Sequence, residues 1–123
     1  MTFEWKEDQP IYRQLRDKVV EAIIDGSLAE GEAIPSVRQV AVDFQINPLT
    51  AQKAYAELVT DGLVEKRRGL GMFVMEGARA KLLSNERDQF LNEEWPAITA
   101  RIKALGLNVE DLLKSATTPK NGK

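Results

Sequence analysis

Residues 47–55, NPLTAQKAY, combine polar side chains with a complete lack of acidic residues. The amides of Asn47 and Gln52 can hydrogen-bond to base edges of a nucleic acid, as can the hydroxyl of Thr50, and Leu49 can contact a thymine methyl group. If a helix begins here, its free backbone N–H groups attract a phosphate, which an acidic side chain would repel. The alternative is an ordinary solvated helix face, capped by Asn47 for stability alone. The candidate contact residues are Asn47, Leu49, Thr50, Gln52, Lys53 and Tyr55.

A second candidate group lies in the preceding segment, PSVRQVA. Ser36 follows a proline and is suited to cap a short helix, so that Arg38 lies near the helix start on a side that the valines do not occupy. In a helix-turn-helix this helix crosses the DNA backbone, and an arginine near its start can bind a phosphate or reach a base. The alternative is a surface arginine that pairs with Asp43 or Glu57.

The densest basic run of the chain is EKRRGLG, residues 65–71. Gly69 and Gly71 allow a tight turn and a close approach of the backbone to another surface. Arginine at such a tip suits phosphate groups or a narrow minor groove. The alternative is a charged edge hairpin that discourages strand pairing. The candidate contact residues here are Lys66, Arg67, Arg68, Gly69 and Gly71.

Three short helices are expected to position these groups, over residues 10–25, 36–44 and 47–61. Gly26 and Gly62 are natural helix ends, and Pro48 suits the first helical position because its missing N–H would have no partner there. Residues 26–35 contain two glycines and a proline, so they are expected to form a loop. The inward face of the third helix is predicted to comprise Ala51, Ala54, Tyr55 and Leu58.

The pattern then changes to two short β-prone arms, residues 63–66 and 72–75, around the glycine-containing tip. Helical periodicity resumes at Ala78, and Asn108 begins a last short helix. We therefore expect a mainly α fold with a small β-hairpin, in which an N-terminal winged helix-turn-helix precedes a C-terminal two-helix dimerisation domain. The expected ranges are 1–76 for the DNA-binding domain, 77–117 for the helical domain and 118–123 for a disordered tail.

The C-terminal helical segment carries an apolar stripe from Leu82 to Leu105. Pro96 interrupts it and either kinks one long helix or splits it in two. The alternative is that the last helix packs onto this stripe, but that helix is too short to cover it. A two-fold homodimer is therefore the simplest arrangement. The predicted interface residues are Leu83, Phe90, Leu91, Trp95, Ile98, Ile102 and Leu105, with Phe90 and Trp95 as anchors.

The composition limits other functions. The 123 residues include 17 basic and 19 acidic side chains, with a net charge of −2, so DNA binding depends on local charge distribution. Histidine and cysteine are absent, which disfavours disulfides, zinc sites and most nucleophile–base pairs. We expect no catalytic residue, metal or cofactor. The acidic N-terminus does not resemble a signal peptide, and no apolar stretch approaches the roughly 20 residues of a membrane span, so a cytoplasmic protein without a membrane partner is expected.

The combined pattern resembles the DNA-binding domain of GntR-type bacterial transcription regulators over about residues 10–75. The segments that carry the resemblance are PIYRQL, IDGSLAEGEAIPSVRQVA and NPLTAQKAYAELVTDGLVEKRRGLGMFV. The short helical remainder resembles the YtrA subfamily, which implies that the C-terminal helices chiefly dimerise the protein.

The resemblance implies that Arg38 is the family's DNA-contacting arginine and that Asn47, Thr50 and Gln52 occupy contact positions of the recognition helix. Gly69 corresponds to the wing-tip glycine that approaches the minor groove. Pro48 and Leu49 replace polar residues of other branches, and Gln52 stands where an arginine is frequent, so base preference does not carry over.

The sequence thus predicts a homodimeric repressor that binds a near-palindromic double-stranded DNA operator. The resemblance to the YtrA subfamily implies that the regulated genes encode transporters, and a small-molecule effector that the sequence does not identify is compatible with this function. The alternative function is a winged-helix module that binds protein instead of DNA. An acid-free surface around Arg38, Lys53 and Arg67 would favour DNA, and an apolar one would favour protein.

Overall fold

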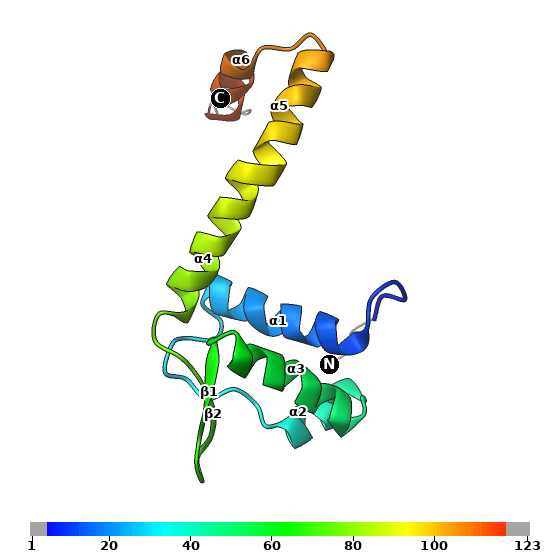
Figure 1. Ribbon diagram of the computed structural model, residues 1–123, viewed down its shortest axis with the longest axis vertical. Helices are drawn as coiled ribbons and strands as arrows, with labels where there is room; N and C mark the ends of the chain where they lie inside the picture. The colour runs from blue at the N-terminus through cyan, green and yellow to red at the C-terminus, as the bar shows by residue number, and fades with distance from the viewer. Residues whose placement is uncertain (1–4, 118–123) are drawn as a thin grey trace. The chain divides into compact units, whose positions relative to one another are not determined.

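The computed structural model describes residues 5–117, and the chain divides into two compact units after Leu83. The first unit contains α1 (Ile11–Asp25), α2 (Val37–Phe44), α3 (Pro48–Thr60), β1 (Val64–Arg67), β2 (Gly71–Val74) and the start of α4 (Ala78–Gln89). The second contains the rest of α4, the π-helical segment η1 (Phe90–Glu94), α5 (Trp95–Ala104) and α6 (Val109–Thr117) (Figure 1). The expected mainly helical fold with a β-hairpin is confirmed. The domain boundary expected after residue 76 stays a prediction, and the predicted tail 118–123 lies outside the described residues.

Two polar side chains begin the helices that carry the candidate contacts. The Ser36 hydroxyl oxygen accepts a hydrogen bond from the Gln39 N–H at 3.0 Å, and Asn47 Oδ1 accepts one from the Leu49 N–H at 2.8 Å. Each bond satisfies a backbone donor that a helix start leaves without an intrahelical partner. Gln45 ends α2 in the left-handed region, with φ 55°, so a turn of three residues links α2 to α3. This short turn is typical of a helix-turn-helix.

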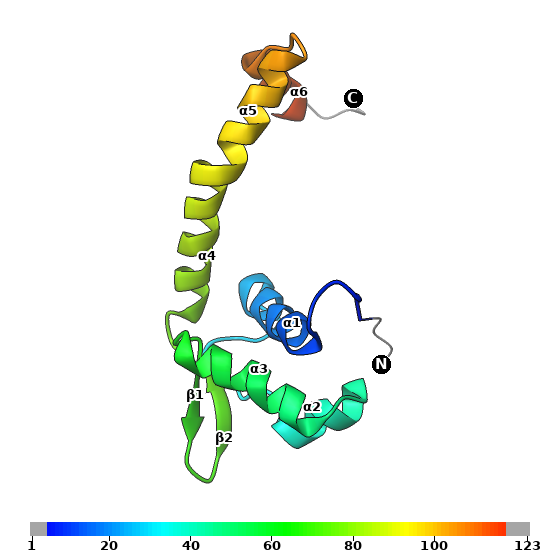
Figure 2. The ribbon, with the colours of Figure 1, turned by 45° about the vertical axis from the view of Figure 1, so that its right-hand side comes forward.

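Helix α3 packs against both α1 and α2, and its inward face is buried as predicted (Figure 2). Tyr55 has only 1% of its surface exposed, and its hydroxyl donates a hydrogen bond to the Pro35 carbonyl at 2.7 Å. Because Pro35 directly precedes the N-cap of α2, this bond fixes the start of α2 relative to α3. The buried core of the first unit comprises Leu15, Val19, Ile23, Ile34, Val40, Ala51, Ala54, Tyr55, Leu58, Leu63, Val64, Val74, Ala78 and Leu82.

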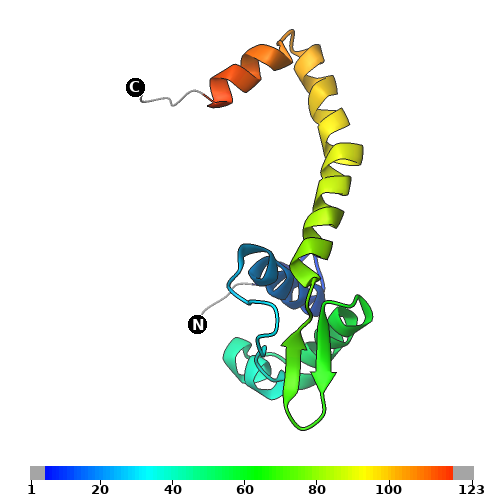
Figure 3. The same cartoon turned by 90° about the vertical axis from the view of Figure 1, so that its left-hand side faces the viewer.

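Strands β1 and β2 pair antiparallel, with Val64 opposite Val74 and Arg67 opposite Gly71 (Figure 3). Both strands are displaced by one residue toward the tip from the predicted arms. The region expected to be a loop contributes to the same sheet. Ala33 forms a β-bridge with Phe73. Backbone hydrogen bonds also join residues 31–34 to Met72 and Val74, the neighbours of Phe73 in β2. The hairpin is therefore attached to the helical core along one strand.

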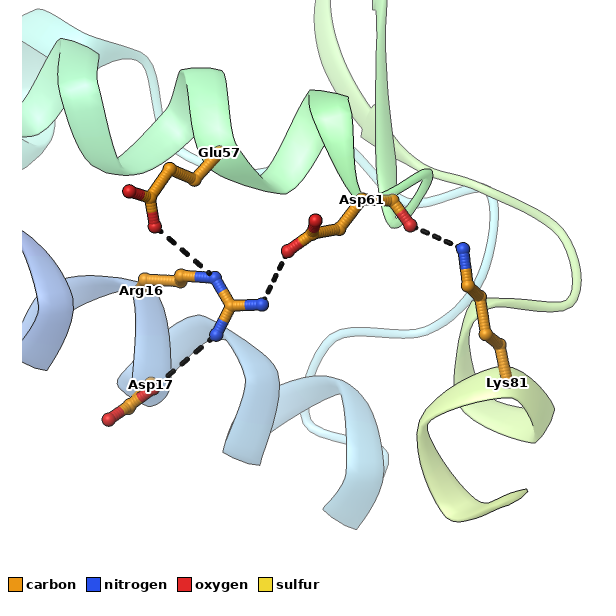
Figure 4. A network of polar contacts seen from close by, with 5 residues as sticks. All are labelled: Arg16, Asp17, Glu57, Asp61 and Lys81. Atoms are coloured by element: carbon orange, nitrogen blue, oxygen red, sulfur yellow. Dashed lines mark hydrogen bonds and ion pairs between the residues drawn. The ribbon is translucent and has the colours of Figure 1, made fainter. Parts of the chain in front are cut away.

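An ion-pair network joins α1 to the end of α3 (Figure 4). The Arg16 guanidinium lies 2.5 Å from an oxygen of Asp61 and 3.6 Å from one of Glu57, and it also lies 3.6 Å from Asp17. The Lys81 ammonium of α4 donates to the main-chain carbonyl of Asp61, which is the C-cap of α3. The Arg16 side chain is 22% exposed, but its acidic partners are 33–52% exposed, so solvent screens these pairs in part.

The start of α4 is fixed to the connection between α1 and α2. The Glu30 carboxylate accepts hydrogen bonds from the backbone N–H groups of Gly77 and Arg79, and these bonds lower the pKa of Glu30. The guanidinium of Arg79 donates to the Ile24 carbonyl at 2.8 Å. Leu82, which was assigned to the C-terminal apolar stripe, is 8% exposed and belongs to the core of the first unit, because it lies on the anchored turns of α4.

In the second unit, the chain remains helical through Pro96. The segment η1 has π-helical hydrogen bonding, in which the Trp95 N–H donates to the Phe90 carbonyl. Proline offers no N–H for an α-helical bond, and a π turn ahead of it accommodates this loss. The rings of Phe90 and Trp95 lie 6.1 Å apart. Among residues 5–117, no helix combines the length and the apolar character that crossing a membrane requires.

Replacing Tyr55 with phenylalanine should lower the free energy of unfolding by about 1 kcal/mol, because the Pro35 carbonyl loses its donor while the aromatic packing remains. Urea denaturation measures this change. Tyr12→Phe is the matched control, since no hydrogen bond to the Tyr12 hydroxyl is found within residues 5–117, and it should change stability by less than about 0.5 kcal/mol. Equal effects of the two variants would contradict the assigned role of Tyr55.

Replacing Glu30 with glutamine should remove a pH-dependent contribution to stability. The folded pKa of Glu30 lies below its unfolded value of about 4.3, so the carboxylate stabilises the fold above that pH, and this contribution disappears as pH falls through the folded pKa. The stability difference between wild type and Glu30→Gln, measured by urea denaturation from pH 7 to pH 3, should therefore shrink at the acid end. Asp25, whose pKa is lowered by hydrogen bonds from Ser27, is common to both proteins and cancels. A difference independent of pH would refute the assignment.

Candidate nucleic-acid interface

The start of α2 presents Ser36 and Arg38 to solvent. No ion pair or hydrogen bond of the Arg38 guanidinium is found within residues 5–117. The partners considered for it are engaged elsewhere, since Asp43 accepts a hydrogen bond from Gln39 at 2.8 Å and Glu57 pairs with Arg16. Arg38 is therefore available to a phosphate or a base, and the Ser36 hydroxyl, although it accepts the capping bond, still has its own hydrogen to donate.

The start of α3 is exposed and has no acidic residue in its first turn. Leu49 is 72% exposed, Gln52 is exposed, and Thr50 is half-buried. Because Asn47 Oδ1 accepts the capping bond, the side-chain group of Asn47 that remains for recognition is its amide NH₂, a donor. This end of the helix can thus offer donors, acceptors and an apolar contact to one surface, together with the positive end of the helix dipole.

Two residues of α3 that were candidate contacts differ from this pattern. Tyr55 is buried, with its hydroxyl bonded to Pro35, so the hypothesis that it contacts DNA is wrong. Burial also raises the pKa of its hydroxyl far above the usual range. The Lys53 ammonium lies 4.1 Å from the centre of the Tyr12 ring, a cation–π contact that directs this exposed side chain toward α1.

The hairpin tip carries the other basic candidates, and they are not equivalent. The Arg67 guanidinium lies over the Phe73 ring at 4.3 Å and pairs with Glu65 at 3.1 Å, so this charge is directed along the strand. Lys66 and Arg68 are exposed, and no ion pair to either is found in the described part of the chain. Gly69 and Gly71 have φ values of 77° and 112°, a backbone conformation that glycine adopts without strain.

Several acidic groups on α2, α3 and β1 are engaged by neighbours. Glu65 pairs with Arg67 and Asp43 with Gln39, while Glu57 and Asp61 at the far end of α3 pair with Arg16. The exposed candidates Arg38, Lys66 and Arg68 are cationic and Asn47 and Gln52 are neutral polar, which suits a polyanion, although Asp43 keeps its charge because its partner Gln39 is neutral. Three large apolar side chains are also exposed here, namely Val42, Leu49 and Leu70.

Sequence reasoning missed Leu70, which is 71% exposed at the hairpin tip. A detectable signal was present, because an apolar residue between two glycines in a basic run has no neighbouring side chain to pack against. No local pattern predicts the pairing of Arg16 with Glu57 and Asp61, since Arg16 lies more than forty residues before them in the chain.

The predicted interface residues of the C-terminal helices remain exposed or half-buried, Leu83 at the end of the first unit and the others in the second. Leu91 and Leu105 are each 59% exposed, Phe90 is 40% and Ile98 is 42% exposed, while Leu83, Trp95 and Ile102 are half-buried. Leu107, Leu112 and Leu113 add exposed apolar surface that the sequence analysis did not assign.

Helices α2 and α3, the short turn between them and the basic hairpin that follows define a winged helix-turn-helix, a class of DNA-binding protein. Residues 11–74 match the family model described as bacterial regulatory proteins, gntR family. The chain is 32% identical over 118 residues to an uncharacterized HTH-type transcriptional regulator, YhcF, of Bacillus subtilis, and the match covers 96% of each chain. It is 36% identical over 77 residues to the HTH-type transcriptional repressor YtrA of the same organism, covering 63% of this chain and 59% of that one.

A solved structure supports the same grouping. A GntR family transcriptional regulator from Listeria monocytogenes matches 94% of this chain and 100% of its own, with 25% identity and a TM-score of 0.73. The chain therefore belongs to the GntR family of bacterial regulatory proteins. It is a YtrA-like DNA-binding transcriptional regulator and not an enzyme.

Proposed function

We propose that this regulator is a homodimeric repressor that binds a near-palindromic operator. In this proposal it controls transporter genes, and it can bind a small-molecule effector. The observation that carries the dimer is the series of exposed or half-buried apolar side chains at Leu91, Trp95, Ile98, Ile102 and Leu105. Their steps of four and three keep one helix face apolar, which is the spacing of helices that pack in pairs. The name repressor belongs to the relative YtrA and supports the sign of regulation proposed here.

Each protomer would place the start of α3 in the major groove of one half-site. Asn47, Thr50 and Gln52 would contact base edges, and Leu49 would contact a thymine methyl group. Arg38 and Ser36 would bind the backbone beside that groove, while the hairpin would reach the adjacent minor groove. Two such units joined by their C-terminal helices would read half-sites about one helical turn apart. Occupation of such a site within a promoter would exclude the transcription machinery.

Replacing Arg38 with alanine should weaken binding to a fragment of the promoter of the protein's own operon by about 1–3 kcal/mol, because a charged contact to DNA is lost. Fluorescence anisotropy at fixed salt measures the affinity, and circular dichroism checks that the fold is unchanged. Arg101→Ala is the matched control, since it removes one positive charge from α5. If both variants bind as tightly as wild type, Arg38 does not contact the operator.

Replacing Ile98 with glutamate should convert the dimer to a monomer at micromolar concentration and weaken operator binding, because a charge would be placed in the apolar face. Light scattering after size-exclusion chromatography gives the mass, and a gel shift gives the affinity. Ala100→Glu is the matched control, because residue 100 lies on a different face of the same helix. A monomeric wild type, or a variant that stays dimeric, would refute the proposed interface.

A further inference from the structure

The tip of the β1–β2 hairpin presents a leucine to solvent. Leu70 is 71% exposed, and its N–H donates to the Arg67 carbonyl at 2.8 Å, which closes the turn. An exposed leucine by itself is ordinary. This leucine differs because it lies at the apex of a hairpin and follows the densest basic run of the chain.

The geometry of the turn leaves Leu70 as a prominent side chain at the apex. Gly69 and Gly71 flank it, and a Cβ added at either position would meet no atom within 4 Å. The tip is therefore narrow, because no side chain widens it on either side of Leu70. Figure 3 shows the connection between the strands at the free end of the hairpin, away from the helices of the first unit. A narrow tip is what the minor groove admits, since that groove is only about 6 Å wide in B-DNA.

We propose that Leu70 enters the minor groove beside each half-site and selects A·T base pairs there. This proposal rests on the proposed function, in which the hairpin reaches the minor groove. In that groove A·T and T·A pairs present only acceptors, whereas a G·C pair adds the amino group of guanine. Leucine has no acceptor for that amino group, so covering it would leave a buried donor without a partner. Leucine leaves the acceptors of both kinds of pair without a donor, so the penalty that distinguishes a G·C pair is its additional unpaired amino group.

The neighbouring charge acts by a different physical term. Arg68 is exposed beside Leu70, and a guanidinium near phosphates contributes counterion release, which makes binding depend on salt. The contact of Leu70 is apolar and contributes no counterion release. Arg68 is therefore expected to make a salt-dependent contact without base preference. Leu70 is expected to make a salt-independent contact with base preference.

Two duplexes test this assignment, both with the core site defined by footprinting on the promoter of the protein's own operon. One has A·T pairs at the flanking positions where the hairpin lies, and the other has G·C pairs there. Anisotropy titrations over a range of salt give the affinity and the salt slope for each. We expect the wild type to prefer the A·T duplex by about tenfold.

Replacing Leu70 with alanine should reduce this preference to less than about twofold and leave the salt slope unchanged. Leu70→Gln, whose amide can accept a hydrogen bond from the guanine amino group and also donate to the acceptors of either pair, should reduce the preference. Arg68→Ala is the matched control, and it should weaken binding to both duplexes, keep the preference and lower the salt slope by about one. Circular dichroism of each variant establishes that it is folded.

The outcomes separate two failures. If wild type binds neither duplex at low salt, the proposed function itself is wrong. If wild type binds and folded Leu70→Ala keeps the same A·T preference, only the role of Leu70 is wrong. A wild type that binds both duplexes equally has the same consequence for Leu70.

Discussion

The burial of one face of α3 is the constraint on which the rest of the DNA-binding unit depends. Ala51, Ala54 and Leu58 have no exposed surface, and Tyr55 has 1%. With this face fixed against α1 and α2, the residues between these positions must point outward, because successive helix residues are rotated by about 100°. The bond from Tyr55 to the Pro35 carbonyl extends the constraint to α2, since it holds the chain directly before the Ser36 cap. A single buried stripe thus fixes the orientation of α3 and, through Tyr55, the position of the start of α2.

Charge is distributed unevenly along α3, which explains how a net acidic chain can present a helix to a polyanion. The acidic groups Glu57 and Asp61 lie at its far end, where the negative end of the helix dipole makes a carboxylate unfavourable. Arg16 offsets that cost by pairing with the side chains of Glu57 and Asp61 (Figure 4). Lys81 adds a second positive charge there, because its ammonium donates to the Asp61 main-chain carbonyl. The opposite end needs no such compensation, because it has no carboxylate in its first turn. The network therefore allows one helix to be acidic at its end and acid-free at its start.

Local features of the sequence were predictable, and features that depend on distant partners were not. The caps Ser36 and Asn47 and the inward face of α3 followed from short patterns, because capping and helical periodicity act within a few residues. The pairing of residues 31–34 with β2 was missed, since it joins segments about forty residues apart and leaves no local pattern. Tyr55 was misassigned as a contact because tyrosine suits both a core and a DNA surface, and its bond to Pro35 decided between them. Leu82 likewise fitted the C-terminal stripe in spacing, but the anchoring of α4 through Glu30, Arg79 and Lys81 placed it in the first core.

The π-helical segment shows why an interruption by proline need not interrupt an apolar face. Phe90 and Trp95 are five residues apart, a separation that in an α-helix would place them about 140° apart around the axis. In η1 the hydrogen bond from the Trp95 N–H to the Phe90 carbonyl encloses five residues, so both side chains fall on similar sides and their rings lie 6.1 Å apart. The spacing of four and three from Leu91 to Leu105 then continues beyond Pro96 along the same stretch of helix. A wider turn, placed directly before the residue that cannot donate a bond, keeps this apolar face continuous where a sharp kink would have divided it.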